Sequence, residues 1–144
     1  MRDWVLDNVP PTSKPFVLDI GSGNGNMLFE LFDAGYDPTR LCGIDYSTDS
    51  VQLAQRIASG RQANAITFKA MDFLSQRPES LVDMNSDSDW DLVLDKGTLD
   101  AMVLAARFDD RASPSEIYPV RVGEILKRGG YLLITCVLFS QYLV

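Results

Sequence analysis

The sequence predicts an α/β fold, with a doubly wound parallel sheet and helices on both faces. Short apolar runs alternate with amphipathic helical patterns along the chain, as strands and crossover helices do. The first apolar run also passes directly into a glycine-rich turn at 21–25 and then into a helical pattern. This alternation of strands and helices predicts the strand order 3-2-1-4-5, numbered along the chain. The length of 144 residues suits a single domain, 1–144.

Each element follows from its periodicity and its end signals. A short helix over 2–9 stops at the pair Pro10-Pro11, and two later helices stop near Gly35 and Gly60. The five predicted strands cover 16–20, 41–44, 65–69, 91–95 and 131–138. The predicted helices between them cover 26–34, 48–59, 98–106 and 113–127.

The last of these helices has a complex beginning. Residues 113–116 (Ser-Pro-Ser-Glu) have the form of a capping box with proline at the first helical position. Pro119 then predicts either a kink or a later start near Tyr118, because a proline removes a helical donor. We expect the helix to run to Lys127 and to end at the glycines 129–130.

Metal-binding patterns are absent from the sequence. The polar segment 75–89 predicts a surface loop. Its acids Asp83, Asp87 and Asp89 could suggest a calcium loop, but the glycine and the terminal glutamate of an EF-hand are missing. The chain has no histidine, which excludes Ser-His-Asp and Cys-His catalysis and histidine metal sites. We therefore predict no metal.

Charge and apolar runs limit the partners. The formal net charge of −7 disfavours a long nucleic acid, which requires cations on the protein. An acidic surface suits a basic partner, such as a lysine on another protein. The longest apolar run, 131–139, is too short to span a membrane, and the N-terminus lacks the apolar core of a signal peptide. We predict a cytoplasmic protein without nucleic-acid or membrane partners.

The two cysteines predict no disulfide. Cys42 and Cys136 fall on the second and fifth predicted strands. In the expected order these strands are three spacings apart, roughly 14 Å. A disulfide requires Cα atoms closer than about 7 Å. Both residues are therefore predicted to be buried free thiols.

The stretch 17–25 carries the strongest functional signal, because an apolar strand and Asp19 lead into glycines at 21, 23 and 25. Glycine lets the backbone turn close to a ligand, and a helix start offers unpaired N–H groups. A tight strand-to-helix corner without a ligand is the alternative. Asp45 lies twenty residues beyond Gly25, at the end of the second strand, where such folds accept hydrogen bonds from ribose hydroxyls. Its alternative role is that of a turn or cap residue.

Four acids stand at the carboxyl ends of predicted strands: Asp19, Asp45, Asp72 and Asp95. Open α/β sheets bind their ligands outside these strand ends, near the switch point beside the first strand. A rim of carboxylates suits a ligand that carries a sulfonium and an ammonium group. A dinucleotide fingerprint would need glycine at position 26, where Asn26 stands, so a dinucleotide oxidoreductase is disfavoured.

Four motifs resemble class I, seven-strand S-adenosylmethionine-dependent methyltransferases, which have a Rossmann-like fold. They are residues 19–25 (Asp-Ile-Gly-Ser-Gly-Asn-Gly), 43–47 (Gly-Ile-Asp-Tyr-Ser), 95–101 (Asp-Lys-Gly-Thr-Leu-Asp-Ala) and 126–135 (Leu-Lys-Arg-Gly-Gly-Tyr-Leu-Leu-Ile-Thr). The third is the most specific, and is similar to the motif of a eukaryotic group of protein-lysine methyltransferases. One branch of that group methylates translation elongation factor 1-alpha. Nucleic-acid amino methyltransferases carry Asn/Asp-Pro-Pro-Tyr/Phe at this place instead.

The resemblance covers about residues 15–136 and implies the cofactor S-adenosyl-L-methionine, with elongation factor 1-alpha as the suspected protein substrate. It implies cofactor contacts from Asp19, Gly21, Ser22, Gly23, Gly25, Asp45, Tyr46, Asp72, Phe73 and Asp95. Asp72 would accept a hydrogen bond from the exocyclic amine of adenine, and Phe73 would flank the ring. A plain turn residue and a core aromatic are the alternatives for these two positions.

The resemblance also implies in-line methyl transfer to a lysine amine, with Asp95 and Lys96 as catalytic residues. Asp95 would orient the amine, and its carboxylate or water would take the proton. The alternative for 97–98 (Gly-Thr) is a glycine turn followed by a threonine-capped helix without function.

The chain departs from this family at both ends. Family members carry an N-terminal segment that helps cover the cofactor, and here only about fifteen residues precede the first strand. After Cys136 the family pattern is lost, and its sixth and seventh strands are missing, so we expect a C-terminally incomplete methyltransferase domain. The uncharged fifth strand would then be an edge through which the chain self-associates. A small-molecule methyltransferase and a non-catalytic cofactor-binding or interaction fragment are the alternative functions.

Overall fold

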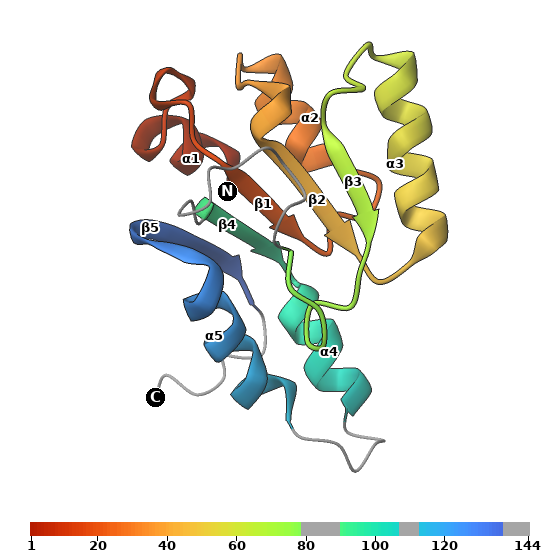
Figure 1. Ribbon diagram of the computed structural model, residues 1–144, viewed down its shortest axis with the longest axis vertical. Helices are drawn as coiled ribbons and strands as arrows, with labels where there is room; N and C mark the ends of the chain where they lie inside the picture. Colours follow the sequence, from red (N-terminus) through yellow and green to blue (C-terminus); the bar gives the residue numbers. More distant parts are fainter. Residues whose placement is uncertain (79–89, 107–112, 137–144) are drawn as a thin grey trace.

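The computed structural model describes residues 1–78, 90–106 and 113–136 (Figure 1). Five parallel strands form a sheet with the order β3-β2-β1-β4-β5, which confirms the predicted fold class and topology. The strands are β1 (Val17–Ile20), β2 (Leu41–Asp45), β3 (Thr67–Ala70), β4 (Trp90–Lys96) and β5 (Leu126–Thr135). The α-helices are α1 (Arg2–Asn8), α2 (Asn26–Asp33), α3 (Thr48–Gly60), α4 (Thr98–Ala106) and α5 (Pro114–Ile125). Two short 3-10 helices are η1 (Pro11–Ser13) and η2 (Pro38–Arg40).

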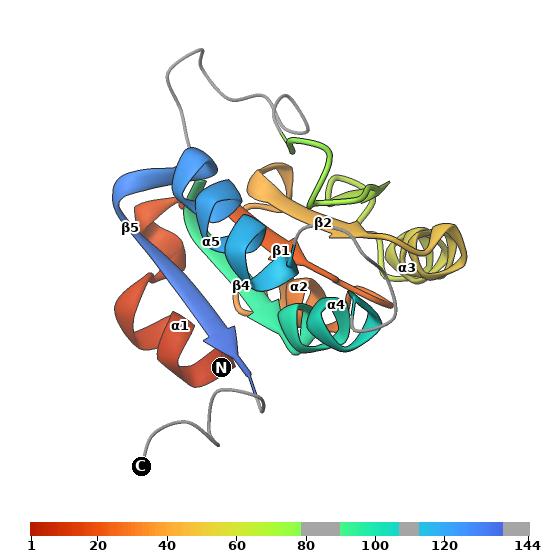
Figure 2. The same cartoon turned by 90° about the horizontal axis from the view of Figure 1, so that it is seen from below.

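Two hydrophobic layers cover the two faces of the sheet. The first contains Val5 of α1, Leu31 of α2 and Ala54 of α3. The second contains Leu99 of α4 and Tyr118 of α5. Figure 2 shows α1 beside β5 and α3 at the opposite side of the sheet. The central strands are covered on both faces and are therefore apolar at nearly every position. Such continuous apolar runs predict strands of a parallel sheet.

The register of the sheet aligns the carboxyl ends of its strands. Ile20, the last residue of β1, pairs with Ile44 of β2 and with Asp95 of β4. Asp45 pairs with Ala70, the last residue of β3. The ends of four strands therefore lie together at one edge of the sheet. Ligands of open α/β sheets bind at this edge.

The boundary between α5 and β5 differs from the prediction. The helix ends at Ile125 and not at Lys127, and the strand begins at Leu126 and not at Tyr131. Leu126 pairs with Trp90, while the next paired residue, Tyr131, lies opposite Leu92. The glycines at 129–130 thus lie inside β5, in an irregular segment of the strand, and do not end the helix. Residues 137–138 of the predicted strand lie outside the described residues.

The start of α5 also differs from the prediction. Pro114 is the first helical residue, so the later start near Tyr118 is wrong, and Pro119 lies inside the helix. Ser113 is the N-cap, but its side chain caps no backbone N–H and instead shares a hydrogen bond of 2.6 Å with Ser115 Oγ. The predicted capping box is therefore not formed.

Cys42 and Cys136 form no disulfide within the described residues, as predicted. Cys42 is buried in the centre of the sheet, and burial raises the pKa of its thiol to about 12. Cys136 is only partly buried, because it follows the edge strand β5. The expected burial of Cys136 is therefore wrong.

Most of the predicted loop at 75–89, with its acids Asp83, Asp87 and Asp89, lies outside the described residues. In the part of the chain that the structure covers, no helix is long and apolar enough to cross a membrane. No group of three or more potential metal ligands occurs within 1–78, 90–106 and 113–136.

Candidate functional site

The turn between β1 and α2 has backbone conformations that require glycine. Gly21, Gly23 and Gly25 have φ values of 70°, 54° and 82°, in the left-handed region. A Cβ atom on Gly21 would lie only 1.9 Å from Thr98 Oγ1, and one on Gly25 would lie 2.7 Å from the ring of Phe68. The turn therefore packs tightly against its neighbours at both ends and is open around Gly23.

The N–H groups of this turn are largely used within the protein. Those of Gly21 and Ser22 both donate to the carbonyl of Ile44, at 2.8 and 2.9 Å. The Gly23 N–H donates to the carboxylate of Asp45 at 2.9 Å. A pyrophosphate site needs several free N–H groups that point at the ligand. The turn is therefore a poor cradle for an anion, which disfavours a dinucleotide.

Asp45 links the glycine-rich turn to the end of β2. Its Oδ2 accepts the Gly23 N–H, and its Oδ1 accepts the Ser47 N–H at 2.8 Å. The helix cap of α3 comes from Ser47, whose Oγ accepts the Ser50 N–H at 3.2 Å. A carboxylate offers about four acceptor positions, so about two remain on Asp45 for hydroxyl donors of a ligand.

Asp19 is a buried carboxylate that accepts no hydrogen bond from the described residues, and its side chain is only 4% exposed. Burial raises its pKa to about 7, and the negative charges of Asp95 and Asp45 add to this rise, while Lys96 opposes it. The protein's own residues therefore compensate the ionised form of Asp19 poorly. A cationic ligand would compensate it.

Asp95 is completely buried at the end of β4 and has three hydrogen-bond donors. Its carboxylate accepts from the backbone N–H groups of Thr98 and Leu99 at 2.7 and 3.1 Å, and from the Tyr118 hydroxyl at 2.6 Å. Burial raises the pKa of Asp95, while these hydrogen bonds hold it down. Asp95 thus fixes the beginning of α4 and holds it against α5.

Thr98 connects this second turn to the first. Its hydroxyl donates to the carbonyl of Ile20 at 2.9 Å, immediately before Gly21. The same side chain occupies the space that a Cβ on Gly21 would need. The β1–α2 turn and the β4–α4 turn are therefore in direct contact.

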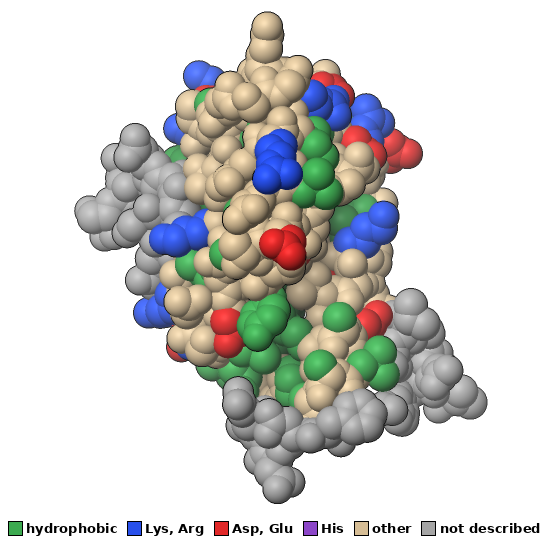
Figure 3. All heavy atoms as spheres, turned by 90° about the vertical axis from the view of Figure 1, so that its right-hand side faces the viewer, with side chains coloured by type: hydrophobic (Ala, Val, Ile, Leu, Met, Phe, Trp, Pro, Cys, Tyr) green, Lys and Arg blue, Asp and Glu red, His purple; other side chains and the backbone are tan. Residues whose placement is uncertain are grey.

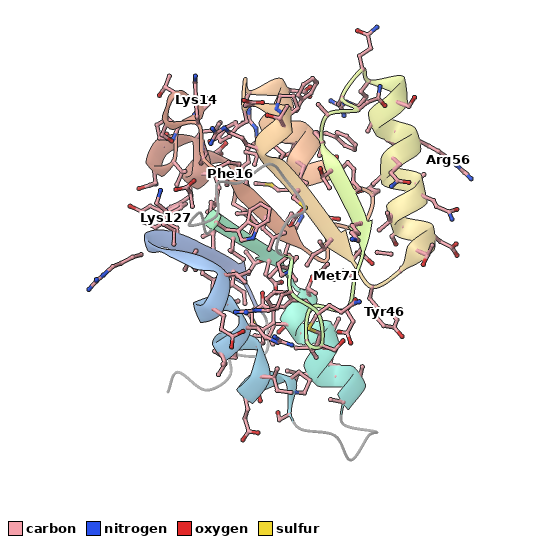
Figure 4. The ribbon with its side chains drawn as sticks, viewed as in Figure 1. Lys14, Phe16, Tyr46, Arg56, Met71 and Lys127 are labelled. Carbon is pink, nitrogen blue, oxygen red and sulfur yellow. The ribbon has the colours of Figure 1, made fainter. Side chains whose placement is uncertain are left out.

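A pocket of about 720 Å³ opens between these turns and the end of β3. Of the predicted ligand residues, Gly21, Asp45, Tyr46, Asp72 and Phe73 line it. Figure 4 shows Tyr46 and Met71 at the end of the sheet that faces α4, and Figure 3 shows apolar side chains gathered beside acidic ones in the lower half of the face that it views. The size of the pocket suits a ligand with a nucleoside and an amino-acid part.

Asp72 and Phe73 also contact other parts of the protein, whereas Tyr46 is exposed. Tyr46 is 83% exposed at the rim. The carboxylate of Asp72 accepts from Leu74 N–H at 3.0 Å and from Ser75 Oγ at 2.7 Å, so it stabilises its own turn. Phe73 is buried and packs edge-on against a tyrosine of α5. The alternative roles of Asp72 and Phe73, a turn residue and a core aromatic, are thus present, and both residues still border the pocket.

The remaining predicted residues do not line the pocket. They are Asp19, Ser22, Gly23, Gly25, Asp95 and Lys96. The Ser22 hydroxyl is buried and has no hydrogen-bond partner among the described residues. Lys96 is exposed at the end of β4. Gly23 and Gly25 shape the turn, while Asp19 and Asp95 are buried.

Sequence reasoning missed the contribution of the two C-terminal helices. Met102 of α4 and Ile117 of α5 line the pocket, and Tyr118 holds Asp95 from behind it. The apolar periodicity of these helices predicts burial, but it does not tell which side chains reach the site. An isolated tyrosine on an apolar helix face was the only available signal.

Comparisons with known proteins agree with this geometry. The model of a family described as "Methyltransferase domain" matches residues 12–141. The "Protein-lysine N-methyltransferase EFM4" of Saccharomyces cerevisiae is 37% identical over 151 aligned residues, covering 98% of this chain and 60% of that protein. The human "EEF1A lysine methyltransferase 2" is 34% identical over 119 residues, covering 83% of this chain and 46% of its own length. The chain thus spans about half the length of the curated relatives that it matches.

Among solved structures, the glycopeptide N-methyltransferase MtfA complexed with S-adenosyl-L-methionine superposes with a TM-score of 0.63. It is 17% identical, and the superposition covers 92% of this chain and 51% of that one. This likeness concerns the fold alone. The match over residues 12–141 and the identity to the yeast and human proteins show that the chain belongs to the methyltransferase-domain family.

Proposed function

We propose that this chain acts as an S-adenosyl-L-methionine-dependent protein-lysine N-methyltransferase with translation elongation factor 1-alpha as its substrate. The observation that carries the proposal is the carboxylate-rimmed pocket at the strand ends, in a chain of the methyltransferase-domain family. The names of the yeast and human relatives support lysine as the acceptor, and the human name supports the elongation factor.

The pocket residues fit this cofactor chemically. Asp45 keeps acceptor positions for the two ribose hydroxyls. Met71 and Phe73 offer apolar surface to an adenine ring, next to the carboxylate of Asp72. Asp19 is a buried carboxylate that accepts no hydrogen bond from the described residues, and a sulfonium or ammonium group would favour its charged form. The occupied N–H groups of the glycine-rich turn support the same choice, because a cation does not need them.

When bound, S-adenosylmethionine supplies an electrophilic methyl group on a positively charged sulfur. The residues that line the pocket would hold and orient it, so positioning would supply most of the rate. Methyl transfer would break the sulfur–carbon bond and form a nitrogen–carbon bond on the lysine. The lysine ammonium first has to lose a proton. We assign this proton to water, because Asp19 and Asp95 are buried and do not line the pocket.

The roles of Asp95 and Lys96 remain proposals. Asp95 is buried and already accepts three hydrogen bonds, so we propose that it acts by fixing the β4–α4 turn. Lys96 is exposed at the same strand end, where it can meet the acceptor segment. Asp95→Asn separates the two possible roles of Asp95. If Asp95 contacts the acceptor directly, the variant should lose turnover alone. If Asp95 fixes the turn, the variant should lose cofactor affinity and turnover together.

We infer a protein substrate rather than a small molecule from the net charge of −7, which suits a basic surface that carries a lysine. A protein substrate of this kind also implies that the chain acts in the cytoplasm. The second candidate is a small-molecule methyltransferase, since MtfA, which has the same fold, is a glycopeptide N-methyltransferase.

The test combines binding and transfer on one preparation of the chain. Calorimetry measures binding of S-adenosylhomocysteine, and tritiated S-adenosylmethionine measures transfer to purified elongation factor 1-alpha, with the modified lysine located by mass spectrometry. Binding together with lysine labelling is the expected result. Binding without transfer would favour the non-catalytic cofactor-binding fragment, and labelling of small molecules alone would favour the second candidate. Absence of binding would refute the proposal as a whole.

A further inference from the structure

Helix α5 contacts both the turn that follows β3 and the end of β4. The ring of Tyr118 packs against Phe73, with ring centroids 5.4 Å apart, on the side of the turn that follows β3. The Tyr118 hydroxyl donates to Asp95 at the end of β4. One helical turn further, the guanidinium of Arg121 donates two hydrogen bonds of 3.2 Å to the carbonyl of Leu74, which lines the pocket. The helix therefore joins two segments that no strand pairing connects.

The hydroxyl of Tyr118 is the only side-chain donor to Asp95 among the described residues. Burial and the neighbouring carboxylate raise the pKa of Tyr118, so this phenol stays protonated and donates. Because Asp95 is fully buried, loss of this donor would leave a buried charge with fewer hydrogen bonds. Asp95 in turn holds the N–H groups that open α4.

The chain of contacts continues into the glycine-rich turn. The N–H of Thr98 is fixed by Asp95, and its hydroxyl is bonded to the Ile20 carbonyl. Its side chain fills the space beside Gly21, and both Gly21 and Thr98 line the pocket. A displacement of the β4–α4 turn would thus reach the ligand side of the β1–α2 turn.

We propose that Tyr118 is a positioning residue, which holds Asp95 and, through Thr98, keeps the β1–α2 and β4–α4 turns in the relative position that ligand binding requires. This rests on the proposed function only for the identity of the ligand. Tyr118 does not itself line the pocket. It acts through the buried carboxylate and the threonine.

The test compares two buried tyrosines. Tyr118→Phe removes the hydroxyl and keeps the ring against Phe73. Tyr36→Phe is the matched control, because the buried Tyr36 hydroxyl donates to the Val9 carbonyl at 2.6 Å, in the layer on the other face of the sheet. Both variants should lower the Tm by about 2–8 °C. Only Tyr118→Phe should weaken binding of S-adenosylhomocysteine, by about three- to tenfold in calorimetry.

A double-mutant cycle tests the route through Thr98. Thr98→Val removes the hydrogen bond to Ile20 and keeps the side-chain shape. In this background, Tyr118→Phe should change the affinity by less than about twofold, because the link to the glycine-rich turn is already broken. Unchanged affinity in the single variant Tyr118→Phe, or fully additive losses in the cycle, would overturn the proposal.

A pH profile gives a readout that ordinary core damage would not change. The Tyr118 hydroxyl lowers the pKa of Asp95, so the pKa should rise in Tyr118→Phe, and the loss of affinity on acidification should begin at a higher pH. The other titratable groups that face Asp95 are Asp19 of β1 and Asp100 of α4, and both stay in place in the variant. Tyr36→Phe should follow the wild-type profile, since its acceptor is an uncharged carbonyl. A shift of equal size in the control would contradict the positioning role.

If the wild-type chain binds no S-adenosylhomocysteine, the proposed function fails, but the positioning claim is still tested. The same cycle is then measured in the free energy of unfolding by urea titration. Coupling between Tyr118→Phe and Thr98→Val is expected there, because the two side chains act on one connected network. Additive effects would refute the network.

Discussion

The two turns that meet at the pocket are built in different ways. The β1–α2 turn is specified by nearby residues, namely its own glycines, together with Asp45 from the adjacent strand. The β4–α4 turn depends on Asp95, whose carboxylate accepts a hydrogen bond from Tyr118 of α5, a helix later in the chain. The conformation of the first turn can therefore be predicted from a short sequence motif. The conformation of the second turn depends on tertiary contacts. Substitutions should affect the two turns unequally.

The largest expected effect is at the contact between the turns. Gly21→Ala should lower the free energy of unfolding by about 2–5 kcal/mol, because a Cβ there adds a clash with Thr98 to the strain of positive φ. Gly23→Ala is the matched control with positive φ and open space, and it should cost only about 1–2 kcal/mol. Urea unfolding measures both variants. Equal losses would mean that the contact with Thr98 is not important.

The second prediction isolates the first turn. Asp45→Ala should weaken S-adenosylmethionine binding by about 1.5–3 kcal/mol, because a charged acceptor of two hydroxyls is lost. Asp49→Ala is the control, since this acid is exposed in the first turn of α3. Calorimetry that finds the same affinity in Asp45→Ala as in the control would remove Asp45 from the cofactor site.

The third prediction uses the raised pKa of Asp19, about 7 against an ordinary 3.8. The folded chain holds this proton more tightly than the unfolded chain, so Asp19 should make the ligand-free protein lose stability as the pH rises from about 4 to about 7. Binding of the cationic cofactor should instead strengthen over the upper part of this range, by up to about tenfold per pH unit below pH 7, because it favours the ionised carboxylate.

The control for this pH dependence is Asp19→Asn, which removes the titrating group and should flatten both trends. Unfolding curves and calorimetric titrations at several pH values give the two slopes. If the variant keeps the wild-type slopes, another group is responsible, and Asp95 is the next candidate because its pKa is also raised.

The smallest expected effect concerns the edge of the sheet next to the second turn. Tyr131 and Leu132 of β5 are 45% and 38% exposed, and we predict that the chain self-associates along this strand. Val137→Lys should raise the monomer fraction if the side chain faces outward, although Val137 lies outside the described residues. Thr135→Lys tests the same idea at an exposed position within β5, and Thr12→Lys adds the same charge at an exposed position outside the strand. Light scattering that shows a stable monomer of the unmodified chain at high micromolar concentration would contradict the prediction.

Much of the fold was predictable because parallel strands and their crossover helices leave strong local patterns. The strand order, the limits of α4 and the positive φ of Gly21 follow from apolar runs, caps and glycine spacing. The start of β5 was not predictable. A Gly-Gly pair usually ends a helix, but the glycines at 129–130 lie within an irregular part of the strand.

The site divides in the same way. Asp45 at the end of β2 was predicted from its distance to the glycine motif, and the structure places it on the pocket. Asp95 was predicted as a group beside the reacting atoms, and this role stays a prediction. The structure shows that Asp95 is buried and accepts a hydrogen bond from Tyr118, which the motif did not reveal. A motif gives the residue type and the strand end. The orientation of the Asp95 carboxylate depends on α5, a helix later in the chain.

The central claim is that the pocket takes a nucleoside ligand with a cationic amino-acid part. Calorimetric titration of the wild-type chain with S-adenosylmethionine, S-adenosylhomocysteine and NAD, just below pH 7 and in two buffers of different ionisation enthalpy, tests it most directly. We predict that both S-adenosyl compounds bind more tightly than NAD, and that S-adenosylmethionine binding releases protons in the wild type but markedly fewer in Asp19→Asn. Tighter binding of NAD, or binding of S-adenosylmethionine with the same proton release in Asp19→Asn, would contradict the account.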